Sequence, residues 1–219
     1  MKKTAVLLAL LLLGATSLSA RYYTTPYQFQ KRWNIAFQGG PMLFYGEYSE
    51  TFGSNGRGWD NFCLFSGVSI GYNFTNAHEM RVNVNYARPN SAGMPYGGFY
   101  PYSFRSIHGF VDYLINFNGL AEEDQAFNPR IYVGLGVAYA WDHSEFTHPF
   151  QGLKDYSVSP GVRLGTVMQY DSTKGVGLFL DLGLEGYTDW YNCQEPVAFP
   201  LDIHLKLSLG IIIHFPKAK

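Results

Sequence analysis

Six charged side chains lie in segments that otherwise alternate between apolar and small residues. Facing carboxylates in such a set could form an acid/base pair. However, the set contains three positive and three negative groups, and buried charges need partners. We therefore interpret it as a neutral, salt-bridged interior network and not as a catalytic site. Its members are Arg81, Asp112, Arg163, Asp181, Glu185 and Lys206.

The histidines do not predict a metal site by their spacing. His204 and His214 share one face of an extended segment, and ten residues of strand separate them by about 33 Å. The segment 141–148 is the richest polar cluster and offers a weak cation site or a His/Ser hydrolase as alternatives. Its adjacent His143 and Ser144 lack the ordered nucleophile–base geometry that activation requires. We expect no catalytic residue, no metal and no cofactor.

The first 20 residues predict export. Met1, Lys2 and Lys3 form a positive start, and residues 5–13 form an apolar run of signal-peptide length. Small residues at 17–20 predict cleavage after Ala20, and the run is too short for a membrane anchor of about 20 residues. We expect a signal peptide at 1–20, an N-terminal periplasmic segment at 21–32, a single domain at 33–215 and a tail at 216–219.

The composition is unusual for a soluble domain. Charged residues make up 15% and aromatic residues 17% of the chain. Removing Lys2 and Lys3 from the 16 basic residues leaves 14 against 17 acidic residues, a net charge of −3 that argues against nucleic acid as a partner. No later apolar stretch is long enough for a membrane helix, so a closed β-barrel is the remaining way to cross a bilayer.

Alternating hydrophobicity predicts eight strands. Apolar residues occupy every second position, for example at 176–184 and 203–215, over lengths that approach or reach the 9–11 residues of a tilted spanning strand. The opposite face carries small residues such as Gly134, Gly165 and Gly183, which suit the narrow interior of an eight-stranded barrel. Aromatic residues near strand ends are typical of membrane girdles. We predict an all-β, eight-stranded, antiparallel, up-and-down transmembrane barrel in which 33–43 pairs with 202–215.

The lengths of the connections indicate the orientation. Candidate periplasmic turns lie at 75–78, 118–129 and 171–174, whereas longer links rich in Gly, Pro and aromatics lie at 46–60, 88–102, 142–155 and 189–201. Bacterial barrels have short periplasmic turns and longer outer loops. Both termini of the barrel are therefore expected in the periplasm.

At its C-terminal end the sequence resembles the small outer-membrane β-barrels of the OmpA/OmpX type. The barrel-assembly signal on the last strand matches Ser208, Gly210, Ile213 and Phe215. The segment 116–139 is also similar to barrels common in Bacteroidota. The resemblance implies the outer membrane of a Gram-negative cell, with the barrel-assembly machinery, membrane lipid and lipopolysaccharide as partners. It implies no specific activity, and we expect no counterpart of the peptidoglycan-binding domain that OmpA-like proteins often carry.

The barrel topology brings three sets of residues together. Hairpin geometry predicts that Glu185 pairs with Lys206 or His204, that Arg163 lies beside Asp181 and Glu185, and that Arg81 lies near Asp112. Cys63 is expected near the outer end of the second strand, below the loop that carries Cys193. A disulfide between these cysteines or two unpaired thiols are both compatible with an exported protein.

Three function classes remain. The first is a non-enzymatic barrel with a structural or surface-interaction role carried by its four long outer loops. The second is an outer-membrane enzyme that modifies lipid A or phospholipid, and a narrow pore is the third. The sequence favours the first class but identifies no extracellular ligand.

Overall fold

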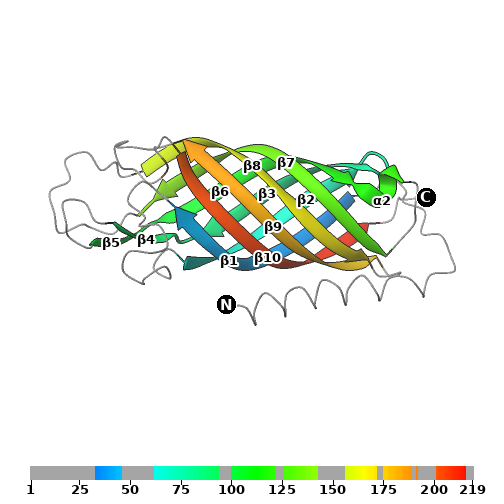
Figure 1. Ribbon diagram of the computed structural model, residues 1–219, viewed down its shortest axis with the longest axis horizontal. Helices are drawn as coiled ribbons and strands as arrows, with labels where there is room; N and C mark the ends of the chain where they lie inside the picture. Colours follow the sequence, from blue (N-terminus) through cyan, green and yellow to red (C-terminus); the bar gives the residue numbers. More distant parts are fainter. Residues whose placement is uncertain are drawn as a thin grey trace, which may run out of the picture.

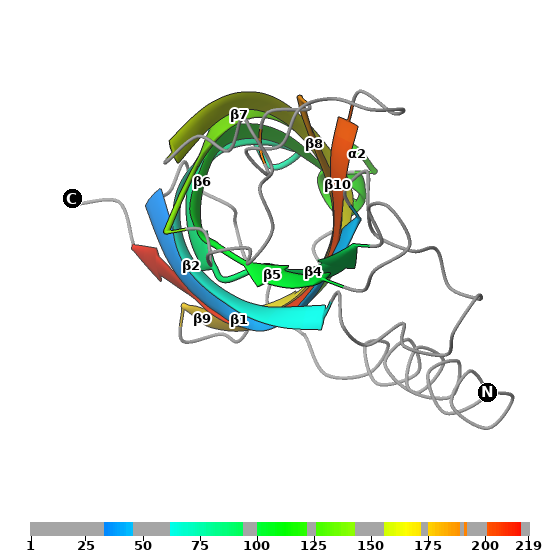
Figure 2. The same cartoon turned by 90° about the vertical axis from the view of Figure 1, so that its left-hand side faces the viewer.

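The protein folds as one closed, tilted barrel of eight strands (Figures 1 and 2). The computed structural model describes residues 33–45, 62–93, 100–121, 126–142, 156–171, 175–188, 191 and 201–215. The barrel strands are β1 (Trp33–Tyr45), β2 (Phe62–Asn73), β3 (His78–Ala87), β6 (Arg105–Asn116), β7 (Phe127–Trp141), β8 (Tyr156–Asp171), β9 (Val176–Thr188) and β10 (Leu201–Phe215).

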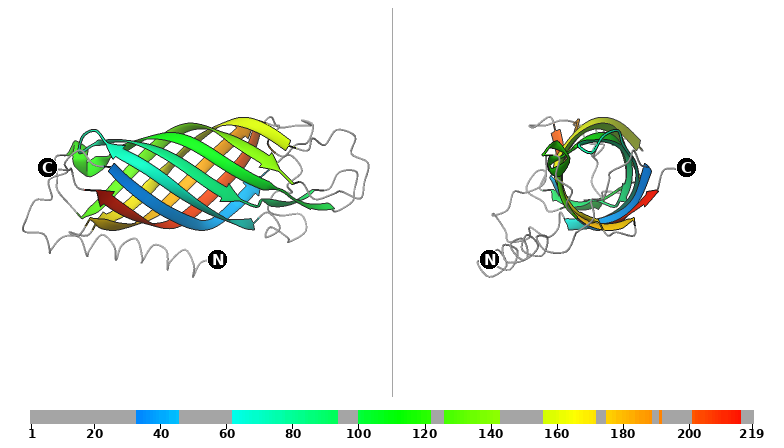
Figure 3. Two further views of the ribbon diagram at one scale, coloured as in Figure 1. Left: turned by 180° about the vertical axis from the view of Figure 1, so that it is seen from behind. Right: turned by 90° about the vertical axis from the view of Figure 1, so that its right-hand side faces the viewer.

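Closure joins the first strand to the last, as the sequence predicts. Each barrel strand pairs antiparallel with its neighbours in the chain, and β1 also pairs with β10, with Trp33 opposite Phe215 and Leu43 opposite Leu205. The left view of Figure 3 shows β1 and β10 side by side. Because the sheet has no free edge, its backbone groups are paired between strands, which a membrane-spanning structure requires.

The outer wall of the barrel is apolar. The alternation seen in the sequence places aliphatic side chains outward on every barrel strand, and Leu135 and Leu209 are each 69% exposed to the surroundings of the chain. The predicted direction of Leu205 is also confirmed, since this side chain is 38% exposed. An exposed apolar band of this extent marks a membrane surface.

Aromatic side chains gather at both ends of this band. At one end Trp33 lies against Tyr72 with ring centroids 4.9 Å apart, and at the other Tyr139 stacks on Trp141 at 5.3 Å. Amphipathic rings prefer the two interfaces of a bilayer, so these groups define the upper and lower limits of the membrane-facing wall. Within the described residues no helix is long and apolar enough to span a membrane.

Two elements lie outside the barrel wall. The short strands β4 (Asn90–Gly93) and β5 (Tyr100–Ser103) form a hairpin beyond β3 and β6 at one end, within the link predicted at 88–102. The single turn α2 (Phe117–Leu120) follows β6 at the other end, where the Asn116 side chain accepts a hydrogen bond from the backbone N–H of Asn118. We call these the hairpin end and the helix end of the barrel (Figure 1).

The short links expected at the helix end are also found there. Phe74 to Ala77 joins β2 to β3, and the Thr75 hydroxyl accepts hydrogen bonds from the backbone N–H groups of Ala77 (3.2 Å) and His78 (3.1 Å). Between β8 and β9, Gly175 has φ +78°, a left-handed conformation that glycine adopts without steric cost. The link predicted at 118–129 is shorter in the structure. Its first residues belong to α2, and β7 already begins at Phe127.

Candidate functional site

Polar side chains fill the interior of the barrel at three levels along its axis. Nearest the helix end, Arg130 is ion-paired with Glu79, which also accepts a hydrogen bond from the Asn34 amide (3.0 Å). At the same end His214 Nε2 lies 2.9 Å from Asp171 Oδ1. All five side chains are buried, so this level of the interior is filled by polar and charged groups.

The middle level is an ion-pair network, and we call it the central network: Arg81, Asp112, Arg163, Asp181 and Tyr132. Arg81 Nε donates to Asp112 Oδ2 (3.0 Å), and the Arg163 guanidinium donates to both oxygens of the same carboxylate. Asp181 accepts from the Tyr132 hydroxyl (2.9 Å) and lies 3.7 Å from Arg81 Nη2. The Tyr132 ring lies 5.0 Å and 5.2 Å from the two guanidinium carbons. Two carboxylates thus balance two guanidiniums around one aromatic ring.

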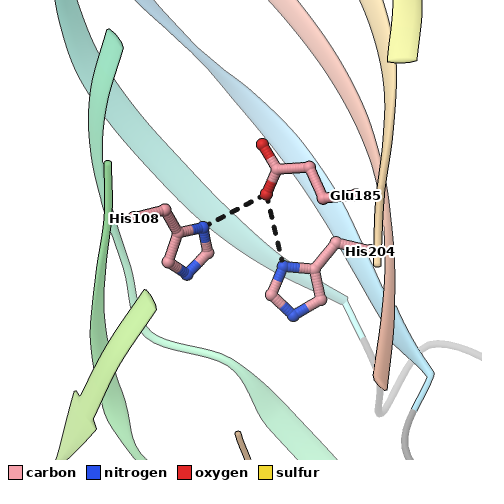
Figure 4. Close-up of side chains that lie close together, drawn as sticks. All are labelled: His108, Glu185 and His204. Carbon is pink, nitrogen blue, oxygen red and sulfur yellow. Dashed lines mark hydrogen bonds and ion pairs between the residues drawn. The ribbon is translucent and has the colours of Figure 1, made fainter. Parts of the chain in front are cut away.

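The level nearest the hairpin end is centred on the carboxylate of Glu185. Lys206 Nζ lies 2.7 Å from its Oε1. Its Oε2 accepts a hydrogen bond from the Tyr187 hydroxyl (2.8 Å) and lies 3.2 Å from His108 Nδ1 and 3.7 Å from His204 Nδ1. We call these five residues the Glu185 centre, and Figure 4 shows both imidazoles turned toward the same carboxylate oxygen.

Strand pairing explains why these residues meet. His204 lies directly opposite Glu185 in the register of β10 and β9, and Arg163 lies opposite Glu185 in the register of β8 and β9. Arg163 Nη1 is 3.6 Å from Glu185 Oε1, so one guanidinium links the Glu185 centre to the central network. His108 comes from β6 on another part of the wall and reaches Glu185 across the lumen.

An aromatic layer covers the Glu185 centre toward the hairpin end. This aromatic cap consists of Phe44, Phe104, Tyr187 and Tyr191, each 0% exposed. The rings of Tyr187 and Tyr191 stack with centroids 4.7 Å apart, and Phe44 and Phe104 meet edge to face at 5.7 Å. The cap therefore shields the Glu185 centre from the hairpin end of the lumen.

One edge of the Glu185 centre has the connectivity of a hydrolytic triad. Ser106 Oγ lies 2.9 Å from His108 Nε2, while His108 Nδ1 faces Glu185 Oε2. Nucleophile, base and orienting carboxylate occur in this order in serine hydrolases. However, the Tyr191 hydroxyl lies 2.9 Å from both His108 Nε2 and Ser106 Oγ, and Ser106 is fully buried. In this conformation a substrate has no room at the serine.

The same centre also offers donors for a metal ion. One nitrogen of His108, one nitrogen of His204 and one oxygen of Glu185 all lie within 4.8 Å of one another. Two imidazoles and a carboxylate form a donor set that first-row transition ions prefer.

The predicted interior residues all point into the barrel, where the structure brings five of the six into the expected pairs or close to them. Lys206 lies beside Glu185, Arg81 beside Asp112, and Arg163 near Glu185. The bonded partner of Arg163 is Asp112, which the sequence did not indicate. Gly134 lies between them on β7 and leaves space for the two side chains to meet.

Sequence reasoning missed His108 and the pair of Glu79 with Arg130. His108 lies four residues before Asp112 on the same strand, so the alternation that predicted an inward Asp112 also applies to His108. Glu79 and Arg130 likewise occupy inward positions, next to the starts of β3 and β7. The same alternation therefore predicts inward side chains for His108, Glu79 and Arg130.

Two further predictions concern single strands. On β10, Ser208 is buried whereas Ile213 and Phe215 face outward at 37% and 43% exposure, and Gly210 lies opposite Gln38 of β1 and Phe179 of β9. Cys63 is buried on the inward face of β2, while Cys193 lies outside the described residues. The disulfide therefore stays a prediction.

Comparison with solved structures finds small barrels of the same architecture. Neisserial surface protein A superposes with a TM-score of 0.50 at 15% identity, covering 84% of this chain and 97% of that chain. OprG of Pseudomonas aeruginosa gives 0.49 at 12% identity (85% and 97% covered), and a major outer membrane protein of Thermus thermophilus gives 0.49 at 15% identity (85% and 100%). No family model matches the chain. No curated protein matches it either.

The closed sheet and the apolar wall between two aromatic belts define the class: the protein is a membrane-spanning β-barrel, and its fold is that of small outer-membrane barrels. Its eight strands give it the small form of this fold, and the resemblance to the OmpA/OmpX type rests on the sequence pattern. The further resemblance to barrels of Bacteroidota rests on the residues alone.

Proposed function

We propose that the protein is a non-enzymatic outer-membrane barrel whose role is structural or depends on surface interaction at the hairpin end. The observation that carries the proposal is the filled lumen. The central network, the Glu185 centre and the aromatic cap follow one another along the interior, and their side chains are paired or closely packed. A barrel filled in this way supplies a rigid anchor, and the segments that extend beyond it are left to meet other molecules.

Charge balance supports an anchor over a pore. An eight-stranded barrel leaves interior space that side chains fill. Asp112 receives both Arg81 and Arg163, so a permeating ion would have to separate buried partners at a cost of several kcal/mol. We expect the periplasm at the helix end and the cell surface at the hairpin end, with lipopolysaccharide around the outer half of the wall.

Single-channel recording tests the closed lumen. The refolded wild-type protein in planar bilayers should show no conductance steps. The double variant Asp112→Ser/Arg163→Ser removes one positive and one negative group from the centre and should conduct measurably. Wild-type steps equal to those of the double variant would contradict the proposal and favour the pore.

Photo-crosslinking on intact cells tests the surface role. A photoreactive residue within the hairpin 90–103 should give protein or polysaccharide adducts. The same residue in place of the wall residue Leu135 should give lipid adducts only. Identical lipid adducts from both positions would argue against an interaction surface at the hairpin end.

The second candidate is an outer-membrane hydrolase acting on lipid A or phospholipid esters. The contact of Ser106, His108 and Glu185 in the order of a triad favours it. It would require Tyr191 to leave Ser106 before a substrate could approach. A fluorophosphonate probe, which labels activated serines, should leave the wild type unlabelled if the first proposal holds. Labelling that disappears in Ser106→Ala would establish the hydrolase instead.

A further inference from the structure

We infer that the Glu185 centre is a binding site for a first-row divalent transition ion such as Zn²⁺, held by His108 Nδ1, His204 Nδ1 and Glu185 Oε2. This inference is independent of the surface role proposed above. It rests on the placement of the three donors, on the unsatisfied imidazole of His204 and on the hydrogen bonds that fix the ring of His108.

The donor spacing suits a small ion. Glu185 Oε2 lies 3.2 Å from His108 Nδ1 and 3.7 Å from His204 Nδ1. Bonds of about 2.0–2.1 Å in tetrahedral geometry place neighbouring donor atoms about 3.4 Å apart. An ion among the three atoms would therefore need shifts of only tenths of an ångström along these two edges. Figure 4 shows the facing nitrogens on one side of the carboxylate.

His204 has an unmet requirement for partners. Its side chain is 0% exposed, and neither ring nitrogen makes a hydrogen bond within the part of the chain that the structure describes. Burial of a polar group without a partner is costly. Nδ1 lies 3.7 Å from Glu185 Oε2, and a metal ion there would replace this long contact by a coordinate bond.

The surroundings of His108 already have the form of an outer ligand shell. Its Nε2 lies 2.9 Å from Ser106 Oγ and 2.9 Å from the Tyr191 hydroxyl. A metal-binding histidine usually donates its second ring N–H to an oxygen, which fixes the tautomer and the ring plane. In the metal-bound form, Nε2–H would donate to these hydroxyls and the lone pair of Nδ1 would bind the ion beside Glu185 Oε2.

The two oxygens of Glu185 are divided between two tasks. Oε1 faces Lys206 Nζ at 2.7 Å and Arg163 Nη1 at 3.6 Å, while Oε2 faces the imidazoles and accepts a hydrogen bond from the Tyr187 hydroxyl (2.8 Å), which occupies one of its two lone pairs. The carboxylate can thus keep its ion pair and still coordinate through Oε2. The two cations make the site unfavourable for ions that bind by charge alone, so Mg²⁺ and Ca²⁺ should be rejected and ions that bond strongly to imidazole nitrogen should be selected.

Metal retention by the untagged mature protein tests the site. The protein is refolded with Zn²⁺, dialysed, and assayed for bound metal per chain. The wild type should retain about one ion, and refolding with Mg²⁺ or Ca²⁺ should leave none. Loss of an outer-shell partner lowers metal affinity by about 10–100-fold. His204→Leu and His108→Leu each remove a direct ligand, so each should lower the Zn²⁺ affinity by at least that factor.

His214→Leu is the matched control. His214 lies on β10 like His204 and is also buried, but it contacts Asp171 near the helix end. This variant should retain Zn²⁺ as the wild type does. Each single variant lacks one histidine only, so the comparison between variants isolates the position of that histidine. Equal retention by His204→Leu and the wild type would overturn the inference, as would absence of binding to the wild type.

A spectroscopic readout protects the test from variants that do not fold. X-ray absorption at the zinc edge of the wild-type protein should report two imidazoles and one carboxylate oxygen in the first shell. A shell without imidazole, or one containing sulfur, would place the ion elsewhere and refute the site.

Discussion

Asp112 and Arg163 form a buried ion pair across Gly134, although a whole strand separates β6 from β8. Asp112, Gly134 and Arg163 lie in one register row of β6, β7 and β8. Because Gly134 has no side chain, the carboxylate and the guanidinium meet above its backbone. A Cβ at this position would lie 2.3 Å from Asp112 Oδ1 and 3.1 Å from Arg163 Cγ.

Gly134→Ala should therefore destabilise the barrel. The added methyl group must displace the ion pair, and overpacking of this kind costs about 1–3 kcal/mol. Gly109→Ala is the control, since a Cβ there finds its nearest neighbour, Val137 O, at 4.0 Å. Urea unfolding in lipid vesicles gives both free energies, and equal values for the two variants would contradict the crossing pair.

Glu185→Gln should destabilise the protein more than Lys206→Met. The Glu185→Gln change removes the carboxylate that lies 2.7 Å from Lys206 Nζ, while Arg163 keeps Asp112. After Lys206→Met, the carboxylate keeps Tyr187, His108 and Arg163 as neighbours. Loss of one partner of a buried pair costs about 3–5 kcal/mol. The double variant should cost less than the sum of the single variants, and strict additivity in unfolding experiments would argue against the pair.

Charge on the lipid-facing wall should be costly in a depth-dependent way. Leu209→Arg places a cation near the middle of β10 on an outward position, and Leu201→Arg places one outward at the hairpin end of the same strand. The expected costs are about 2–4 kcal/mol at the midplane and about 0–1 kcal/mol near the interface. Folding titrations into vesicles measure the free energies of both variants. A larger cost for Leu201→Arg than for Leu209→Arg would contradict the proposed position of the membrane on the wall.

Cys63 and Cys193 form a disulfide or remain two unpaired thiols, and one measurement separates these alternatives. A bridge between them would close a loop of roughly 130 residues and stabilise the fold by up to about 4–5 kcal/mol in the chain-entropy model. Protein taken from native membranes and alkylated without reductant should show an intact mass without added alkyl groups. Two alkyl groups per chain would rule the bridge out.

The sequence predicted the wall of the barrel better than its interior. Alternation sets the direction of each side chain, so the eight strands, the closure of β1 on β10 and the outward leucines follow from it. The β4–β5 hairpin was not predicted, because four-residue strands in a segment rich in Gly and Pro carry too little alternation.

Interior partners depend on distances that alternation does not contain. Parity places Arg163 and Asp181 inward, but the gap above Gly134 and the length of the guanidinium arm decide that Arg163 reaches Asp112. The meeting of His108 with Glu185 also requires the diameter of the closed barrel, since the two residues are 77 positions apart in the chain. The spacing of histidines along one strand therefore does not predict the contact between His108 and Glu185.

The contacts that cross the lumen also have a mechanical consequence. Arg130 to Glu79, Arg163 to Asp112, Tyr132 to Asp181 and His108 to Glu185 each join strands that are not neighbours in the sheet. These contacts lie at three levels along the barrel axis. Flattening the circular cross-section into an ellipse would lengthen some of them and shorten others. Lateral pressure from the bilayer should therefore leave the barrel round.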